Sequence, residues 1–318
     1  MDEASADSKQ RSSVSEPQPP QPAAPEGEQG GRPTGVKVMS LVKTLLFTIL
    51  IALILKTFII EAYRIPSGSM ENTLLVGDFL FVNKFVYGVR TPRYVPLTNL
   101  AIPSISFPAL KRVRRGDVIV FEYPGDRENL SDPESVNYVK RCIGLPGDTI
   151  HILAGRVFVN GRELLLPPHA KVTEEGYEAR WRGQDELFPP DSRFTLDNYG
   201  PLVVPKRGDP IELSSATFDR WKDLIRKEGH AAEITREGAV LIDGVQSTRY
   251  AIQGNYYFVL GDNRDNSLDS RYWGFVPDEN LIGEALVTYW SWDTELQVSS
   301  LWEKFKTVRW ERIGNLVR

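Results

Sequence analysis

Two serines that could do chemistry lie one residue apart in the stretch IPSGSM, residues 65–70. Pro66 fixes one backbone dihedral and Gly68 permits a tight path, so the stretch presents a hydroxyl group on a bend. A serine hydroxyl can attack a carbonyl carbon, but it is a weak nucleophile and needs a neighbouring base. On these residues alone, a plain turn is the simpler interpretation of Ser67 and Ser69.

A lysine that could act as this base lies in the segment YVKRCIGLPGD, residues 138–148. Lys140 and Arg141 are adjacent, so on a strand their side chains point to opposite faces. If Arg141 faces water, Lys140 faces the interior, where burial lowers the pKa of the amine. A neutral lysine is a competent general base. The alternative is an edge-strand lysine in solvent, which carries no catalytic meaning.

The densest polar cluster of the chain is GDNRDNSLDSR, residues 261–271. A calcium loop is one alternative, but an arginine interrupts the alternate acidic positions and the glycine-plus-glutamate pattern is missing. A solvated acidic turn is another. Asp269 and Arg271 are alternate residues, so on an extended segment they could pair on one face and brace a site, with Ser267 close before them.

The elements that must position these groups are mostly strands. Short apolar runs bounded by turn residues predict strands within 74–84, 118–121, 137–144, 239–242 and 256–260. The pair Asn160-Gly161 predicts a hairpin turn. One helix is expected over about 216–228, because its apolar residues recur at helical spacing and Gly229 supplies a stop signal.

The N-terminal part of the chain has a different composition. Residues 1–35 hold almost no large apolar side chain and are predicted to be disordered. Residues 41–60 read LVKTLLFTILIALILKTFII, and a helix over them spans roughly 30 Å, the thickness of a bilayer core. No small-x-small cleavage site follows, so we expect an uncleaved signal anchor. The basic residues before the run predict a cytoplasmic N-terminus.

Composition narrows the chemistry further. The chain has 318 residues with a net charge of −4, which gives no indication of nucleic-acid binding. One cysteine, Cys142, precludes an internal disulfide and argues against a structural zinc site. The C-terminal stretch 300–318 mixes tryptophans with basic residues, which suits either a bilayer interface or a helix packed on the core.

The segments IPSGSM, YVKRCIGLPGD and GDNRDNSLDSRYWGFVP, in this order behind a signal anchor, closely resemble the bacterial type I signal peptidase (leader peptidase) family. The resemblance covers roughly residues 58–148 and 255–290. It implies that Ser69 is the nucleophile, Lys140 the general base, and Ser67 an oxyanion-hole residue together with Ser69. One departure is Asn72, where the family often carries proline, and we expect a local change in this loop.

The resemblance also implies the groups around this pair. Ser267, Asp269 and Arg271 would hold the lysine and the site. Small pockets for the residues before the cut would be lined by Tyr63, Ile65, Met70, Leu74, Leu80, Tyr138 and Val139. A peptide-cleaving Ser-Lys pair needs no histidine, and neither a metal nor a cofactor is implied. The Ser-x-x-Lys pattern of β-lactamases is absent after both serines.

The fold implied is mainly β, with one N-terminal transmembrane helix. We expect a disordered cytoplasmic tail (1–35), a signal anchor (36–60), a catalytic core of antiparallel sheets (61–148 and 255–318) and an inserted β-rich domain with one helix (149–254). The catalytic part would lie on the extracytoplasmic side of the inner or plasma membrane. Partners would be secretory preproteins with signal peptides, and membrane lipid, but not nucleic acid.

The predicted function is membrane-bound cleavage of signal peptides after small-x-small sites. One rival is a cytosolic Ser-Lys autoprotease of the SOS-repressor type, which would need a DNA-binding N-terminus in place of the apolar run. The other is a non-catalytic, membrane-anchored binding protein. Such a protein would not need Ser69, Lys140 and Asp269 together.

Overall fold

The computed structural model describes residues 34–88, 108–125, 137–165, 187–190, 192–294, 296 and 301–318. The tail predicted to be disordered, residues 1–35, lies outside the described residues except at its last two positions. The chain divides into two compact units, Met1–Ile49 and Leu50–Arg318, and all the strands of the described residues belong to the second unit.

Helix α1, Thr34–Phe58, contains most of the apolar run that the sequence assigns to a signal anchor. Large apolar side chains along it, such as Leu45, Leu46 and Phe47, are exposed. Within the described part of the chain, no helix has both the length and the apolar character needed to cross a bilayer. The signal anchor therefore stays a prediction.

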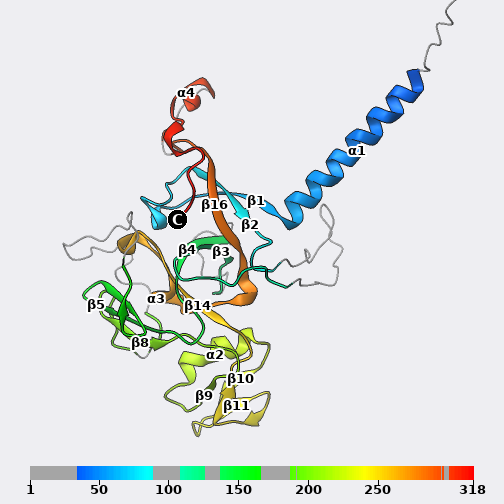
Figure 1. Ribbon diagram of the computed structural model, residues 1–318. Coiled ribbons are helices and arrows are strands. Elements are labelled where there is room, and N and C mark those ends of the chain that lie inside the picture. Colours follow the sequence, from blue (N-terminus) through cyan, green and yellow to red (C-terminus); the bar gives the residue numbers. More distant parts are fainter. Residues whose placement is uncertain are drawn as a thin grey trace, which may run out of the picture. The chain divides into compact units, whose positions relative to one another are not determined.

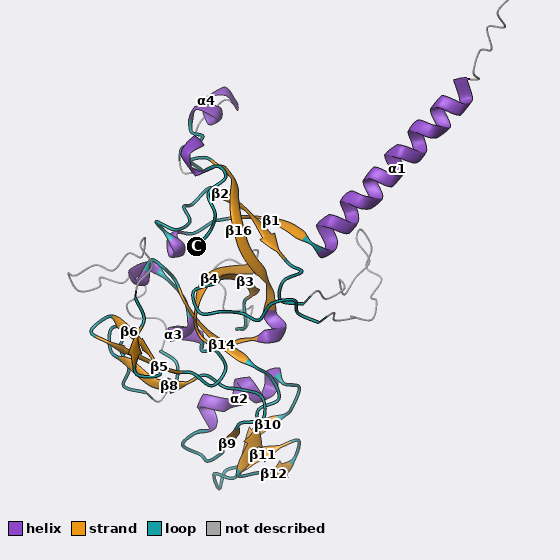
Figure 2. Ribbon diagram, in the orientation of Figure 1, coloured by secondary structure: helices purple, strands orange, loops and turns teal. Residues whose placement is uncertain are grey.

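A seven-stranded sheet forms the framework of the second unit, in the order β1-β2-β16-β3-β4-β14-β15 (Figures 1 and 2). Every hydrogen-bonded pair within it is antiparallel. The long strand β16 lies between β2 and β3. The bounds are β1 Ile60–Arg64, β2 Asp78–Asn83, β3 Val118–Glu122, β4 Asn137–Gly144, β14 Tyr256–Leu260, β15 Val276–Pro277 and β16 Leu281–Ser291.

Three smaller antiparallel sheets come from the segment between β4 and β14. One has the order β7-β6-β5-β8, the second β10-β11-β12, and the third pairs β13 with β9. Their strands are β5 Thr149–Leu153, β6 Arg156–Val159, β7 Arg162–Glu163, β8 Tyr199–Val203, β9 Pro210–Glu212, β10 Ala232–Ile234, β11 Val240–Ile242, β12 Val245–Gln246 and β13 Arg249–Ala251. The boundaries of an inserted domain at 149 and 254 stay a prediction.

Short helices complete the described chain. Helix α2, Phe218–Lys227, confirms the helix expected from the spacing of its apolar residues, and it buries Phe218, Leu224 and Ile225. The others are η1 Gly68–Met70, η3 Arg264–Asn266, α3 Ser270–Trp273, η4 Asp278–Asn280, α4 Leu301–Lys306 and η5 Trp310–Arg312. The hairpin expected at Asn160-Gly161 joins β6 to β7, and both residues have positive φ. The mainly β expectation is confirmed.

The buried apolar side chains of the described residues form three clusters, and one of them lies beside the serine bend. It contains Ile65, Met70, Leu74, Leu80, Val82, Val118, Val120 and Ala285, with Tyr63, Val139, Ile282 and Val317 packed against it. These residues come from β1, β2, β3, β4, β16, the bend and the chain's C-terminal part. Burial of such side chains contributes roughly 1.5–3 kcal/mol each, so the bend is fixed to the sheet by packing.

Candidate active site

Ser69 lies in the short helix η1, directly after strand β1. Its side chain is buried, with 8% of the residue exposed. The expected tight path at Gly68 is not needed, because a Cβ placed there would meet nothing closer than 3.8 Å, the amide nitrogen of Asn266. Gly68 has no positive φ, so the bend relies on the 3₁₀ turn itself.

Lys140 approaches this serine from strand β4. Its Nζ lies 2.7 Å from Ser69 Oγ and donates a second bond of 3.2 Å to the carbonyl of Val139. The residue is 2% exposed. Burial lowers the pKa of Lys140 to about 8, although the charges of Asp269 and Asp262 act in the opposite direction. A large fraction of the lysine is therefore neutral at a mildly alkaline pH.

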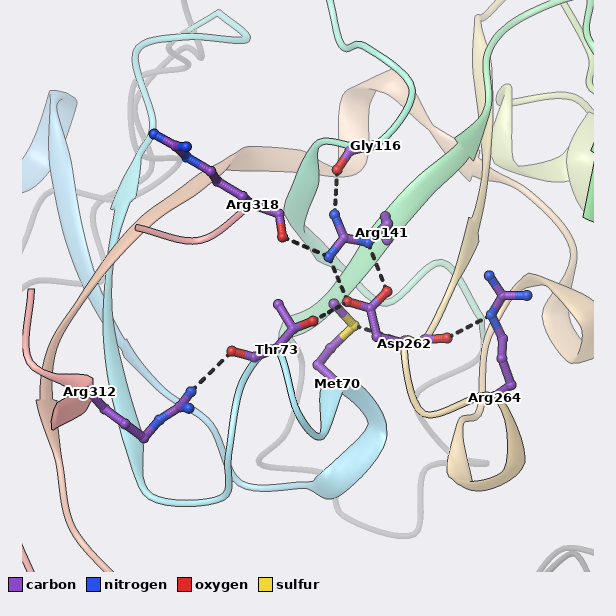
Figure 3. A network of polar contacts seen from close by, with 9 residues as sticks. Met70, Thr73, Gly116, Arg141, Asp262, Arg264, Arg312 and Arg318 are labelled. Carbon is purple, nitrogen blue, oxygen red and sulfur yellow. Dashed lines mark hydrogen bonds and ion pairs between the residues drawn. The ribbon is translucent and has the colours of Figure 1, made fainter. Parts of the chain in front are cut away.

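Arg141 does not face water, and the premise that placed Lys140 inside is wrong. Arg141 is 4% exposed and forms a two-pronged ion pair with Asp262, with Nε–Oδ1 and Nη2–Oδ2 distances of 2.8 and 2.6 Å (Figure 3). Its Nη1 also donates to the carbonyl of Gly116 at 2.7 Å. Strand β4 lies between β3 and β14, and both of its faces are covered, so both basic side chains are buried.

Asp269 and Arg271 pair as expected, although on a helix start and not on an extended segment. Asp269 caps helix α3 and accepts bonds from Arg271 Nε and Nη2, both at 2.9 Å. Burial by itself raises the pKa of the Asp269 carboxyl, but the Arg271 guanidinium outweighs it and holds the pKa below its usual range. Asp269 is therefore an anion, and its charge favours the protonated form of Lys140.

Ser267 is fully buried between these groups and the nucleophile. Its Oγ has no hydrogen-bond partner of good geometry among the described residues, although it lies close enough to favour the ionised form of Asp269. A Cβ at Gly261 would collide with the Ser267 side chain and would lie 2.5 Å from the carbonyl oxygen of Ser69. Glycine is required at 261 because the Ser267 side chain and the Ser69 carbonyl both lie where a Cβ would be.

Ser67 lies at the exposed side of the bend. Its Oγ is 3.4 Å from Ser69 Oγ, so the two hydroxyl groups share one small space. A hydroxyl in this position can donate to an oxyanion that forms at a carbonyl under attack by Ser69.

Six of the seven residues predicted to line the pockets belong to the apolar cluster beside the bend. Ile65, Met70, Leu74 and Leu80 are buried in it, and Tyr63 and Val139 pack against it. Tyr138 packs in another cluster, with Phe121 and Trp273, and its ring centroid lies 5.3 Å from Lys140 Nζ. The expected local change at Asn72 is a φ of 75°, which a proline ring, held near −65°, cannot adopt.

Several residues of this site were missed by the sequence reasoning. Asn263 donates its backbone N–H to the Ser69 carbonyl at 3.1 Å and its amide to the Gly68 carbonyl at 3.1 Å. Thr73 Oγ1 donates to Asp262 Oδ2 at 2.6 Å. Asp262 and Asn263 lie at the start of the same polar cluster, 261–271, that contains Asp269. Their position in this cluster was the sequence feature that could have indicated them. Among the described residues, no group of three or more metal-binding side chains occurs.

Comparison with known proteins decides the family. The sequence model of the family described as "Signal peptidase, peptidase S26" matches residues 38–290 of this chain. A signal peptidase I from Buchnera aphidicola subsp. Schizaphis graminum is 32% identical over 85% of this chain and 78% of that protein. The chain belongs to the signal peptidase family, peptidase S26.

Other signal peptidases are similarly related to this one. The signal peptidase I of Pseudomonas fluorescens is 34% identical over 76% of this chain and 69% of that protein. A solved signal peptidase I structure from Enterococcus faecalis covers 55% of this chain at 24% identity, with a TM-score of 0.29, and it carries no weight for the fold. As a family member, the chain is a serine peptidase that cleaves signal peptides, and the two rival classes are set aside.

Proposed function

We propose that this signal peptidase cleaves its precursors with Ser69 as the nucleophile and Lys140 as the general base. The observation that carries the proposal is the 2.7 Å contact between Lys140 Nζ and Ser69 Oγ in a buried environment. With the amine neutral, the Ser69 hydroxyl can donate its proton to Nζ while Oγ attacks the scissile carbonyl.

The remaining groups have supporting roles in this proposal. Ser67 Oγ donates to the oxyanion of the tetrahedral intermediate, together with the backbone N–H of Ser69. Lys140, now protonated, returns the proton to the leaving amine as the scissile C–N bond breaks and leaves the acyl group on Ser69 Oγ. The neutral lysine then takes a proton from a water molecule that attacks this ester, and it returns the proton to Ser69 Oγ as the C–O bond breaks. Among the described residues Lys140 Nζ bonds to Ser69 and Val139, so the Asp269–Arg271 pair and Ser267 support the site around the lysine without a hydrogen bond to it. The Asp269 carboxylate stabilises, by its charge, the ammonium that forms in the reaction.

The substrates that fit this site are secretory preproteins with small residues at the first and third positions before the cut. The proposed pocket walls include buried side chains of the cluster beside the bend, such as Ile65, Leu74 and Leu80, which a large substrate side chain would have to displace. Tyr63, Met70, Tyr138 and Val139 complete the proposed pocket walls.

We also propose that residues 36–60 anchor the protein in the inner or plasma membrane, with the N-terminus in the cytoplasm. The apolar composition of 41–60 and the exposed apolar side chains of α1 support this. Only a few residues separate Ile60 from Ser69, so the site would lie near the membrane surface on the extracytoplasmic side, where membrane-inserted precursors are accessible. Residues 61–148 and 255–318 would form the catalytic core around an inserted domain, 149–254.

The decisive experiment compares detergent-solubilised wild-type protein with a Ser69→Ala variant on a secretory precursor. We expect cleavage at one small-x-small site by the wild type and none by the variant. Cleavage by both forms, or by neither, would contradict the proposal. Protection of residues 61–318 from protease added to the cytoplasmic side of sealed membranes tests the topology separately, since digestion of this part would contradict it.

A further inference from the structure

The C-terminal segment, residues 307–318, lies along strand β16 beyond the part of that strand that pairs with β3. Arg309 N–H donates to the Ser291 carbonyl at 2.9 Å, and Val317 N–H donates to the Leu286 carbonyl at 2.9 Å. The mixture of tryptophans and basic residues in 300–318 predicted either an interfacial stretch or a helix packed on the core. Only Leu301–Lys306 and a 3₁₀ turn are helical, because the rest satisfies the backbone groups of β16.

The Arg312 side chain extends from this segment to the loop that follows the nucleophile in the chain. Its Nε lies 3.0 Å from Asp78 Oδ1, and its Nη2 lies 2.6 Å from Asp78 Oδ2. The same Nη2 donates to the carbonyl of Thr73 at 3.0 Å (Figure 3). The Asp78 side chain is fully buried and that of Arg312 is 16% exposed, so solvent screens this ion pair only weakly.

Thr73 is thereby held from two sides. Its carbonyl accepts from Arg312, while its hydroxyl donates to Asp262, which is paired with Arg141 (Figure 3). Thr73 lies between Met70 and Leu74, two of the proposed pocket residues. The loop from Met70 to Asp78 therefore has a fixed position relative to both the lysine strand and the C-terminal segment.

The chain contains a second copy of this arrangement outside the pocket. In the turn Leu75–Asp78, the Asp78 carboxylate accepts the N–H of Leu75 at 2.8 Å. In the turn 145–148, Asp148 accepts the N–H of Leu145 at 2.8 Å and is paired with Arg115 at 2.8 Å. Both turns place a glycine with positive φ before the aspartate, 90° at Gly77 and 88° at Gly147.

The two turns differ in what their arginines reach. Arg115 Nε donates to the carbonyl of Ile143 on strand β4, whereas Arg312 reaches the loop between the nucleophile and Leu74. The Arg115 turn is therefore a reference for such an ion pair without contact to the proposed pocket, in a less buried setting, since the Arg115 and Asp148 side chains are 33% and 12% exposed.

We propose that Arg312 is a positioning residue of this peptidase, which fixes the Met70–Asp78 loop and thereby sets turnover and selectivity for small side chains. The proposal rests on the proposed function, since it takes the pocket walls from there. Arg312 does not touch the reacting atoms. It acts through Asp78 and the Thr73 carbonyl, so its loss moves the pocket wall and the residues that follow Ser69.

The test measures kcat/KM of Arg312→Gln and Arg115→Gln on two precursors, one with alanine and one with valine at the last position before the cut. We expect Arg312→Gln to lower kcat/KM on the alanine precursor about 10-fold or more, because small misplacements of a site cost one to two orders of magnitude. The preference for alanine over valine should narrow. Arg115→Gln should leave both quantities within about 2-fold, although both variants lower the melting temperature.

The single variant leaves the buried Asp78 carboxylate without its arginine, and this variant could fail to fold. In that case the double variant Asp78→Asn with Arg312→Gln, which removes both charges, replaces it in the test. Its control is Asp148→Asn with Arg115→Gln. A folded Arg312 variant with wild-type kcat/KM and wild-type preference would overturn the proposal, as would an equal loss in the Arg115 control. Wild-type protein is the positive control, and its failure to cleave would contradict the proposed function instead.

Discussion

Lys140 Nζ and Ser69 Oγ lie 2.7 Å apart although 71 residues separate them in the chain. The contact joins the middle of an interior strand to a 3₁₀ turn that directly follows the first strand of the sheet. Because both side chains are buried, the protonation state of the lysine decides what this pair can do.

The first prediction concerns the pH dependence of the reaction. Burial holds the pKa of Lys140 at about 8, and the reaction needs the neutral amine. We therefore expect kcat/KM to rise with pH and to level off above about pH 8. Lys140→Arg should be inactive although it keeps the charge, because a guanidinium stays protonated. Substantial turnover by this variant would remove Lys140 as the base.

The second prediction concerns stability. The unfolded chain holds the Lys140 proton up to the ordinary value of 10.5, whereas the folded chain releases it near pH 8. Between these values the unfolded state binds more protons, so the free energy of unfolding rises with pH, by up to about 1.4 kcal/mol per pH unit.

Lys140→Met, which is similar in length, should lose this contribution. Urea unfolding from pH 7.5 to 10.5 gives the free energy of unfolding of both proteins at each pH. The difference between the two proteins isolates the contribution of Lys140, because the titration of the tyrosines is common to both. Parallel curves for the two proteins would contradict a depressed pKa at Lys140.

The third prediction concerns Ser67. Ser67→Ala should keep the fold and lower kcat by roughly 10²–10³-fold, as expected for the loss of one oxyanion donor. Ser67→Thr should retain much of the activity because it keeps the hydroxyl group. Single-turnover cleavage rates of the three proteins measure this, and wild-type rates in the alanine variant would reduce Ser67 to a turn residue.

The fourth prediction concerns specificity. A precursor with Ala-x-Ala before the cut should be processed, and one with phenylalanine in place of the last alanine should not, because a ring would have to displace proposed pocket walls that are buried in the apolar cluster, such as Ile65, Leu74 and Leu80. Mass spectrometry of the products identifies the site in each case. Equal processing of both precursors would refute the pocket assignment.

The fifth prediction contrasts two glycines next to the nucleophile, Gly68 before it in the chain and Gly261 near its carbonyl oxygen. Gly261→Ala should lower the free energy of unfolding by about 1–3 kcal/mol, because the added methyl group overlaps Ser267 and the Ser69 carbonyl. Gly68→Ala should be neutral or slightly stabilising, since its Cβ has room and its φ is ordinary. Denaturant unfolding of both variants decides it, and equal losses would contradict the close approach at Gly261.

The sequence predicted the residue types that could do chemistry, but not the residues that surround them in the fold. Strand alternation separates the Lys140 and Arg141 side chains, but it does not show which faces of a strand are covered. Arg141 is buried because β4 is an interior strand and Asp262 neutralises it. This partner could not be predicted, since it lies 121 residues away and depends on the pairing of β4 with β14.

The same limit applies to Arg312 and Asp78, which are 234 residues apart. From sequence alone, a basic residue near position 312 is predicted to face solvent or lipid. Its ion pair becomes apparent only from the path of the C-terminal segment along β16. By contrast, strand β14 and helix α2 are set by local patterns, and their observed bounds lie close to the expected ones.

The antiparallel pairing of β4 and β14 has a consequence for how this chain can vary in length. Residue Phe258 is paired with Gly144 and Leu260 with Arg141, so the chain leaves and re-enters the large sheet at neighbouring positions. With respect to the large sheet, the residues between β4 and β14 form one long connection between two neighbouring strands. Its length can change at a small cost in loop-closure entropy. As long as Ile143 and Phe258 stay buried in their apolar cluster, such insertions and deletions leave the pairing of β4 and β14 unchanged. Lys140 on β4 and Asp269, which follows β14, then keep their positions.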